Sequence, residues 1–176
     1  QSTNIIVSIG SSYSFLDNGT DQGTAWRLQS FNDSGWAVGQ APLGYGQADL
    51  NTIVSYGNKP ANKYITTCFR HSFATPPNSA TSNLLVRLRR DDGAVVYLNG
   101  QEVFRSNMPT GAITFATFAS SNVSGAAGSN FLSNAIDSTL LRNGTNLLAV
   151  EIHQVNATSG DISFDLELQA ERLLAP

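Results

Sequence analysis

The sequence predicts an all-β protein built as an antiparallel β-sandwich. Runs of strand length in which apolar and polar residues alternate recur along the chain, as in residues 84–90 and 162–170. Clusters of Gly, Asn, Asp, Ser and Pro separate these runs, and this rhythm is typical of sandwiches. No stretch shows a sustained apolar repeat of helical period, so long helices are not expected.

The alternating runs predict strands whose positions follow directly from the pattern. They cover residues 4–9, 64–73, 84–90, 94–98, 102–105, 113–118, 146–154 and 162–170. Residues 146–154 and 162–170 each place acidic side chains opposite an apolar row, so both strands are expected to be half-buried with an acidic outer face.

The turns between strands are predicted from residues that tolerate unusual backbone angles. Asp91-Asp92-Gly93 and Asn99-Gly100 both accept positive φ, so each is expected to form a tight hairpin. Residues 137–141 predict a short helical turn with Asp137 as its N-cap, and the chain is expected to hold at most one such turn.

Residues 16–58 differ from the rest of the chain because they are rich in glycine and show little alternation. A long irregular stretch is unusual in a compact domain, so we expect an ordered wrap over the sandwich, with Trp36 as its anchor. Long loops often carry binding sites. This wrap is therefore the first place to search for one.

The composition excludes several classes of function. Only 13% of the 176 residues are charged and the net charge is −3, so no basic stripe is available for nucleic acid. Arg87, Arg89 and Arg90 form the one basic cluster, which is expected to be a solvated strand face. No apolar run approaches the roughly eighteen residues that span a bilayer, so membrane insertion is not expected.

Domain and compartment follow from length and from the cysteine count. Residues 1–176 fit one domain. Cys68 is the only cysteine, which rules out an intrachain disulfide, and it is expected to pack as a small hydrophobe. Because Gln1 is not a translation start, we expect an extracellular or cell-surface chain after signal-peptide removal, or an excised module.

Four segments carry a resemblance to a known family. They are LDNGTDQGTAW (16–26), APLGYG (41–46), RRDDGAVVYLNGQEVFRSNMPTG (89–111), and NLLAVEIHQ followed by SGDISFDLEL (146–168). Together they resemble the galactose-binding-like jelly-roll accessory modules of secreted bacterial multidomain proteins, and they are similar to the sugar-binding jelly-roll domains of glycoside hydrolases. The resemblance implies a binding module. Relatives often carry an acidic residue near Gly128, where this chain reads GAAGSN, and this departure speaks against a metal site there.

Catalysis is not expected from the residues present. The chain lacks a GxSxG elbow and holds only two histidines, His71 and His153. A pair of carboxylates for glycoside cleavage would have to come from turns or from outward strand faces. The acids in question are Asp91, Asp92, Glu102, Glu151, Asp161 and Asp165. We therefore expect a protein that is not an enzyme.

Carbohydrate is the ligand that the sequence favours. Sugar sites combine aromatic faces with convergent polar groups. The aromatic candidates are Trp26, Trp36, Tyr45 and Tyr56, and the polar candidates are Arg90, Asp92, His153 and Gln154. Structural roles compete with this interpretation, because Asp92 can cap its own turn and His153 can lie on a half-exposed strand face.

A structural calcium ion is a second hypothesis. Residues 17–21 read DNGTD, and calcium takes about six to eight oxygen ligands of this kind. Asp17 and Asp21 are the candidate ligands, whereas an ordinary Asn-Gly turn is the competing interpretation.

The alternative function is structural, as the subunit of an extracellular fibre or matrix in which copies of the chain are one another's partners. The apolar segment NIIVSIG (4–10) could add as a strand to the sheet edge of a neighbouring copy. Lys59 and Lys63 are the only lysines, so few are available to protect sheet edges from such pairing.

Overall fold

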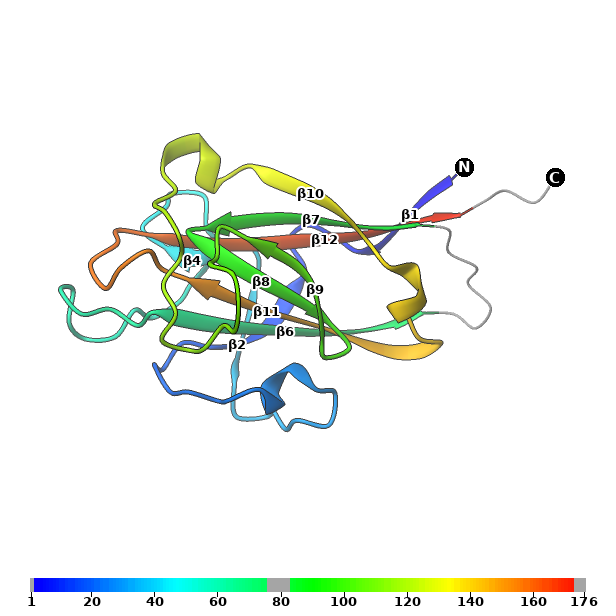
Figure 1. Ribbon diagram of the computed structural model, residues 1–176, viewed down its shortest axis with the longest axis horizontal. Coiled ribbons are helices and arrows are strands. Elements are labelled where there is room, and N and C mark those ends of the chain that lie inside the picture. The colour runs from blue at the N-terminus through cyan, green and yellow to red at the C-terminus, as the bar shows by residue number, and fades with distance from the viewer. Residues whose placement is uncertain (1, 76–82, 173–176) are drawn as a thin grey trace.

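The computed structural model describes residues 2–75 and 83–172, which form a two-layer β-sandwich (Figure 1). The first sheet has the order β10 (Phe131–Ile136), β7 (Asn83–Asp91), β12 (Ile162–Arg172), β4 (Leu43–Tyr45) and β5 (Thr52–Ile53), and β1 (Ser2–Val7) also pairs with β12. The second sheet has the order β3 (Ala37–Gln40), β2 (Ser12–Leu16), β6 (Thr66–Thr75), β11 (Gly144–His153), β8 (Gly93–Leu98) and β9 (Gln101–Ser106). The all-β sandwich prediction is confirmed.

The main core lies between the two sheets and follows from the period-2 alternation. Leu88 of β7 pairs with Leu166 of β12, and both side chains are fully buried. Phe69 of β6 reaches across from the second sheet and packs on Phe164 of β12, with ring centroids 4.5 Å apart. One row of each strand therefore fills the interior, as the alternation predicts.

A second hydrophobic cluster covers the outer face of the second sheet. Trp26 packs there on Tyr97 of β8 with ring centroids 6.0 Å apart, and Cys68 of β6 is buried beside them. Trp26 belongs to the turn η1 (Ala25–Arg27), within the segment expected to wrap the sandwich. Both faces of β8 are consequently buried, and the expected packing of Cys68 is confirmed.

Several local expectations are wrong. Residues 16–58 are not irregular throughout, because β3, β4 and β5 lie within them. Residues 113–118 form turns and coil where a strand was expected. In the described part of the chain there are three short 3-10 turns, η1, η2 (Gly125–Gly128) and η3 (Ser138–Leu140), where at most one was expected. Asp137 does cap η3, as its side chain accepts a hydrogen bond from Thr139 N.

The two predicted hairpins have different outcomes. Asn99 and Gly100 adopt φ of 53° and 88° between β8 and β9, so this hairpin is confirmed. Asp91-Asp92-Gly93 does not form a hairpin, because β7 belongs to the first sheet and β8 to the second. The chain crosses between the two layers at this point, and this crossing places the aspartates in the interior.

The charged rows expected to face solvent are instead covered. Glu151, Asp165 and Glu167 are buried, and so is Arg89. Loops cross the outer faces of both sheets and provide partners there, as when Gly10 N donates to both carboxylate oxygens of Asp165. The alternation correctly predicts which side chains share a face of a strand, but the outer faces are covered and not exposed as expected. Within residues 2–75 and 83–172, no helix is long and apolar enough to cross a membrane.

Candidate functional site

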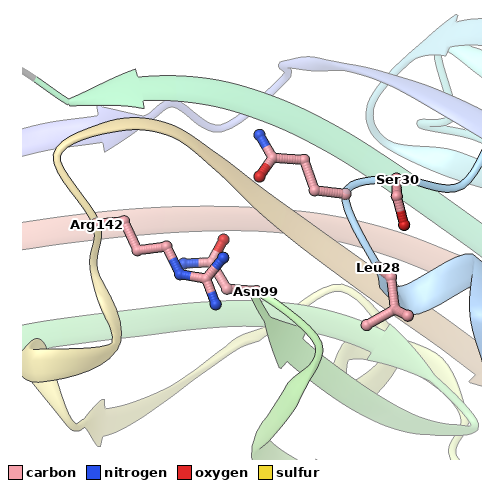
Figure 2. A pocket seen from close by; sticks show the side chains of 5 residues that line it. Leu28, Ser30, Asn99 and Arg142 are labelled. Carbon is pink, nitrogen blue, oxygen red and sulfur yellow. The ribbon is translucent and has the colours of Figure 1, made fainter.

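An open surface pocket of about 470 Å³ lies where three loops meet, within the range of roughly 300–1,000 Å³ that is usual for ligand pockets. Leu28, Gln29 and Ser30 follow η1, Asn99 occupies the β8–β9 turn, and Arg142 lies between η3 and β11. Figure 2 shows the Arg142 side chain extending toward Asn99, with Leu28 and Ser30 on the other side of the pocket.

The loop that carries Leu28 is held by one buried arginine of β6. Arg70 donates to the backbone oxygens of Trp26, Leu28 and Phe31 and forms an ion pair with Asp33 at 2.8 Å. These bonds satisfy carbonyl groups that otherwise have no strand or helix partner. Leu28 is therefore kept at the surface, 49% exposed, by a fixed backbone.

Asn99 forms a rigid part of the opposite wall. Its Nδ2 donates to Leu140 O and to Asn146 Oδ1, both at 2.8 Å, while its Oδ1 accepts from Leu147 N at 3.0 Å. The amide is thus engaged on both its nitrogen and its oxygen. Asn99 positions the wall and leaves little capacity to bind a ligand itself.

Arg142 combines a fixed backbone with a free side chain. The buried Asn146 accepts from Arg142 N and donates to Arg142 O, each at 2.8 Å, and Thr75 Oγ1 donates to the same carbonyl oxygen. The exposed guanidinium has no hydrogen bond or ion pair among the residues that the structure describes. A cation is therefore presented to the pocket from a rigid support.

The two walls touch at Gly100. A Cβ added there would lie 2.8 Å from Leu28 Cδ2, and the positive φ of Gly100 also disfavours any other residue. The glycine lets the β8–β9 turn approach the loop after η1 closely.

A smaller cavity of about 130 Å³ adjoins the second hydrophobic cluster. It is lined by Asp21, Gly23, Thr24, Arg27, Ile113, Thr114 and Phe115. Arg27 is engaged, because its Nη2 lies 3.2 Å from Glu151 Oε1 and its guanidinium carbon 4.2 Å from the centre of the Tyr97 ring. This cavity is too small for a sugar ring with its hydroxyl groups.

A buried polar network lies beneath that cavity. Glu151 Oε1 accepts from the Tyr97 hydroxyl at 2.6 Å, and Glu151 Oε2 lies 3.3 Å from His153 Nε2. Burial raises the pKa of Glu151, but His153, Tyr97 and Arg27 together outweigh that effect and hold the pKa below its usual range. Glu151 is thus an ionised carboxylate whose charge is already balanced by neighbouring groups of the protein.

A second set of buried acids lies where the chain crosses between the sheets. Gln47 Nε2 donates to Asp91 Oδ2 at 3.0 Å and to Asp161 Oδ2 at 3.3 Å. Burial, followed by the charges of Asp161 and Asp92, raises the pKa of Asp91 to about 8. A Cβ added at Gly128 would lie 2.4 Å from Asp91 Oδ2, so this part of the cluster is tightly filled.

The aromatic residues predicted to contact sugar form two separate pairs. Trp26 is only 2% exposed and packs with the half-buried Trp36 on the second sheet, with ring centroids 6.4 Å apart. Tyr45 of β4 is buried on the first sheet and packs with the half-buried Tyr56 at 5.1 Å. The anchor of the wrap is Trp26 more than Trp36, and neither pair lines the 470 Å³ pocket.

The predicted polar residues hold loops together. Asp92 does not cap its own turn, because its carboxylate accepts from Val123 N at 2.7 Å and from Val155 N at 2.8 Å. Arg90 donates to Ser106 Oγ at 2.9 Å and to the carbonyl of Asp92. Asp92 therefore joins segments that are far apart in the sequence, whereas Arg90 links β7 to the end of β9.

His153 and Gln154 have similar structural positions at the end of β11. His153 is fully buried and not half-exposed as expected, with its Nδ1 2.7 Å from Thr117 O. Gln154 is also buried and donates to Tyr64 O at 2.8 Å. Of the four predicted polar residues, Asp92, His153 and Gln154 are buried and Arg90 is half-buried, and none of them lines the pocket.

The predicted calcium ligands both accept hydrogen bonds from backbone groups. Asp17 Oδ2 accepts from Ser55 N at 2.5 Å, and Asp21 Oδ1 accepts from Gly23 N at 2.8 Å. Across the described ranges, no group of three or more His, Cys, Asp or Glu side chains is arranged to hold a metal ion. The calcium hypothesis stays a prediction.

Sequence reasoning missed the residues of the pocket while indicating its region. Leu28, Gln29 and Ser30 lie within the segment expected to carry a binding site, but the sequence pattern favours the aromatic residues of that segment. Asn99 was assigned only to its turn. Arg142 stands alone in an uncharged stretch between a helical turn and a strand, and that isolation was the available signal.

Comparison with known proteins supports the fold. No protein-family model and no curated protein matches the sequence. Among solved structures, Bacteroides uniformis β-glucuronidase 2, covalently bound to cyclophellitol-6-carboxylate aziridine, is similar over 96% of this chain and 18% of its own, with 18% identity and a TM-score of 0.60. Bifidobacterium dentium β-glucuronidase, complexed with coumarin-3-O-glucuronide, is similar over 86% of this chain and 20% of its own, with 22% sequence identity and a TM-score of 0.54.

A third similar structure is a glycosyl hydrolase family 2 member from Bacteroides cellulosilyticus. The similarity covers 93% of this chain and 20% of that protein, with 16% sequence identity and a TM-score of 0.60. The chain therefore shares a β-sandwich fold with one part of each of these three structures. It spans only about a fifth of these proteins. At such low identity the likeness is one of fold.

Proposed function

We propose that this chain is a non-catalytic extracellular module that binds a polysaccharide or a glycosylated surface in the 470 Å³ pocket. One observation carries the proposal: Leu28, which is exposed, and Arg142, whose guanidinium has no partner among the described residues, line the same pocket from rigidly held loops. Sugars offer an apolar C–H face and a rim of hydroxyl groups, and a mixed pocket of this kind complements both.

The comparisons support an accessory role. The similar structures are glycosidases, and this sandwich corresponds to a fifth or less of the three described above. A domain of this size beside a larger catalytic part is a common arrangement for a sugar-binding module. That inference rests on fold analogy, so the pocket must be tested directly.

The positions of the acids favour binding over catalysis. A general acid or nucleophile must reach the atom that reacts. Asp91 and Glu151 are both buried, and each lies against side chains of the protein's own interior. Neither lines the pocket. A glycosidase would need at least one carboxylate of a pair to face substrate.

Affinity electrophoresis in gels that contain neutral and acidic polysaccharides tests the proposal. We expect at least one polymer to retard the wild-type protein, and Leu28→Ser to reduce the retardation. Val38→Ser is the matched control, because Val38 is 70% exposed on β3 and does not line the pocket. If no polysaccharide in a broad panel retards the wild type, the proposal fails.

Assembly into fibres by strand addition is the second candidate, and the apolar surface of the amino-terminal segment favours it. Ile5 and Ile9 are 52% and 45% exposed. However, β1 already pairs with β12 of the same chain, with Ile5 opposite Gln169. Light scattering over a range of protein concentrations distinguishes the candidates, since a strictly monomeric species excludes assembly.

Calcium at Asp17 and Asp21 is a separate proposal with a simple test. A bound ion stabilises the folded state by mass action. If the ion is present, a chelator lowers the melting temperature of the wild type and leaves that of Asp21→Ala unchanged. If the chelator has no effect on the wild type, the loop is an ordinary turn.

A further inference from the structure

We infer that the pocket selects carboxylate-bearing glycans, polymers of uronic acids, through the guanidinium of Arg142. This inference rests on the proposed function and specifies the class of ligand. Its basis is the way in which this chain uses its arginines.

Most arginines of the described chain are engaged by the protein itself. The ion pairs are Arg27 with Glu151, Arg70 with Asp33, Arg87 with Glu167, Arg89 with Asp49, and Arg105 with Glu102. Arg90 donates to Ser106 and to a backbone carbonyl. Within residues 2–75 and 83–171, Arg142 is the only arginine whose side chain has no hydrogen bond or ion pair.

The chemistry of a free guanidinium defines its preferred ligand. Its planar donor groups match the two oxygens of a carboxylate, and such charge-assisted bonds are about twice as strong as neutral ones. None of the described residues that line the pocket is acidic, so none of them competes for the cation. A ligand carboxylate would be the first anion that Arg142 meets.

The support of Arg142 limits the cost of binding. Asn146 holds both the N–H and the carbonyl of Arg142, so only the side chain must be ordered when a ligand arrives. The rest of the pocket suits the sugar part of the ligand. Leu28 offers an apolar surface, and the exposed side chains of Gln29 and Ser30 can form hydrogen bonds with hydroxyl groups.

The net charge of the chain argues against unspecific attraction. At −3, the protein as a whole repels polyanions, and this repulsion is strongest at low salt. Binding of a polyuronate would therefore have to arise from local contacts. A matched neutral polymer isolates the part contributed by the carboxylate.

The experiment compares polygalacturonate with its carboxyl-reduced, neutral form in affinity electrophoresis. We expect the wild type to bind the acidic polymer about tenfold or more tightly than the reduced one, as a charge-assisted pair implies. Arg142→Gln should lose that preference. Arg142→Lys should retain part of it, because lysine keeps the positive charge but lacks the planar pair of donors that matches a carboxylate. Arg105→Gln makes the same change in net charge outside the pocket and should bind as the wild type does.

Folding and binding are separable in this design. The Arg142 side chain has no partner to lose among the described residues, so Arg142→Gln should melt at the wild-type temperature. Equal binding of both polymers, or undiminished binding of polygalacturonate by Arg142→Gln, overturns the inference and leaves the proposed function standing. Equally tight binding of dextran sulfate also overturns it. If neither these nor any other polysaccharide binds, both proposals fail.

Discussion

Replacing Asp91 by Asn should remove a pH dependence from the stability of the fold. Burial, Asp161 and Asp92 raise the pKa of Asp91 from 3.8 to about 8, against a smaller opposing effect of Arg90. The folded protein therefore binds this proton more tightly than the unfolded chain does. The stabilisation is fully present below about pH 4, declines as the pH rises, and is lost through about pH 8.

The size of the effect follows from the width of that interval. Each pKa unit corresponds to about 1.36 kcal/mol. Between about pH 5 and pH 8, nearly three units of the interval are crossed, so the wild type should lose on the order of 4 kcal/mol from this group. Asn resembles the protonated acid and can still accept from Gln47, so the variant should show no such loss.

Urea unfolding at several pH values between about 5 and 8 measures the difference between wild type and Asp91→Asn. The difference between the two curves should be smallest at the acidic end and should widen toward pH 8, where the variant gains most relative to the wild type. Asp49→Asn is the control, because Arg89 lowers the pKa of Asp49 and keeps it ionised throughout this range. Parallel curves for wild type and Asp91→Asn would refute the assignment.

Three further changes test the supports of the site. Arg70→Ala removes the buried guanidinium that holds the loop after η1. The free energy of unfolding in urea should fall by about 2–4 kcal/mol, and glycan binding should weaken. An unchanged urea midpoint would contradict this role. Gly100→Ala should lower the free energy of unfolding by about 1–2 kcal/mol, because residue 100 has a positive φ. The same change should reduce the retardation of the protein in affinity gels. Binding equal to that of the wild type would show that the two walls can separate. In the wild type, the 2.6 Å hydrogen bond from Tyr97 lowers the pKa of Glu151, and Tyr97→Phe removes this bond. The variant should lose about 1–3 kcal/mol of unfolding free energy near pH 7 and less near pH 4. An equal loss at both pH values would exclude the electrostatic explanation.

The long strands could be predicted from sequence because their signal is local. In β7 and β12 a two-residue period places every second side chain in the core, and the period is visible without knowledge of any partner. β3, β4 and β5 contain only four, three and two residues, which is too short for a period to appear. Their positions depend on pairing with distant strands.

The role of Asp92 shows why turn chemistry could be misjudged. Asp-Gly suits a hairpin and also suits the crossing between two layers, and the residues alone do not distinguish them. The partners of Asp92 are the backbone groups of Val123 and Val155, 31 and 63 residues further along the chain. Only the folded chain reveals them. The same holds for Arg142, whose side chain matters because it has no partner among the residues that the structure describes.

The pocket is organised so that its stability and its binding chemistry are carried by different residues. Arg70 and Asn146 are buried, bond to backbone groups and fix the two walls, while Leu28 and Arg142 project from those walls into the open. Changes at the exposed pair should therefore alter binding at nearly constant stability, and changes at the buried pair should alter both. A ligand that meets preformed walls incurs little ordering cost. Specificity can then depend on the guanidinium of Arg142, which has no partner among the described residues.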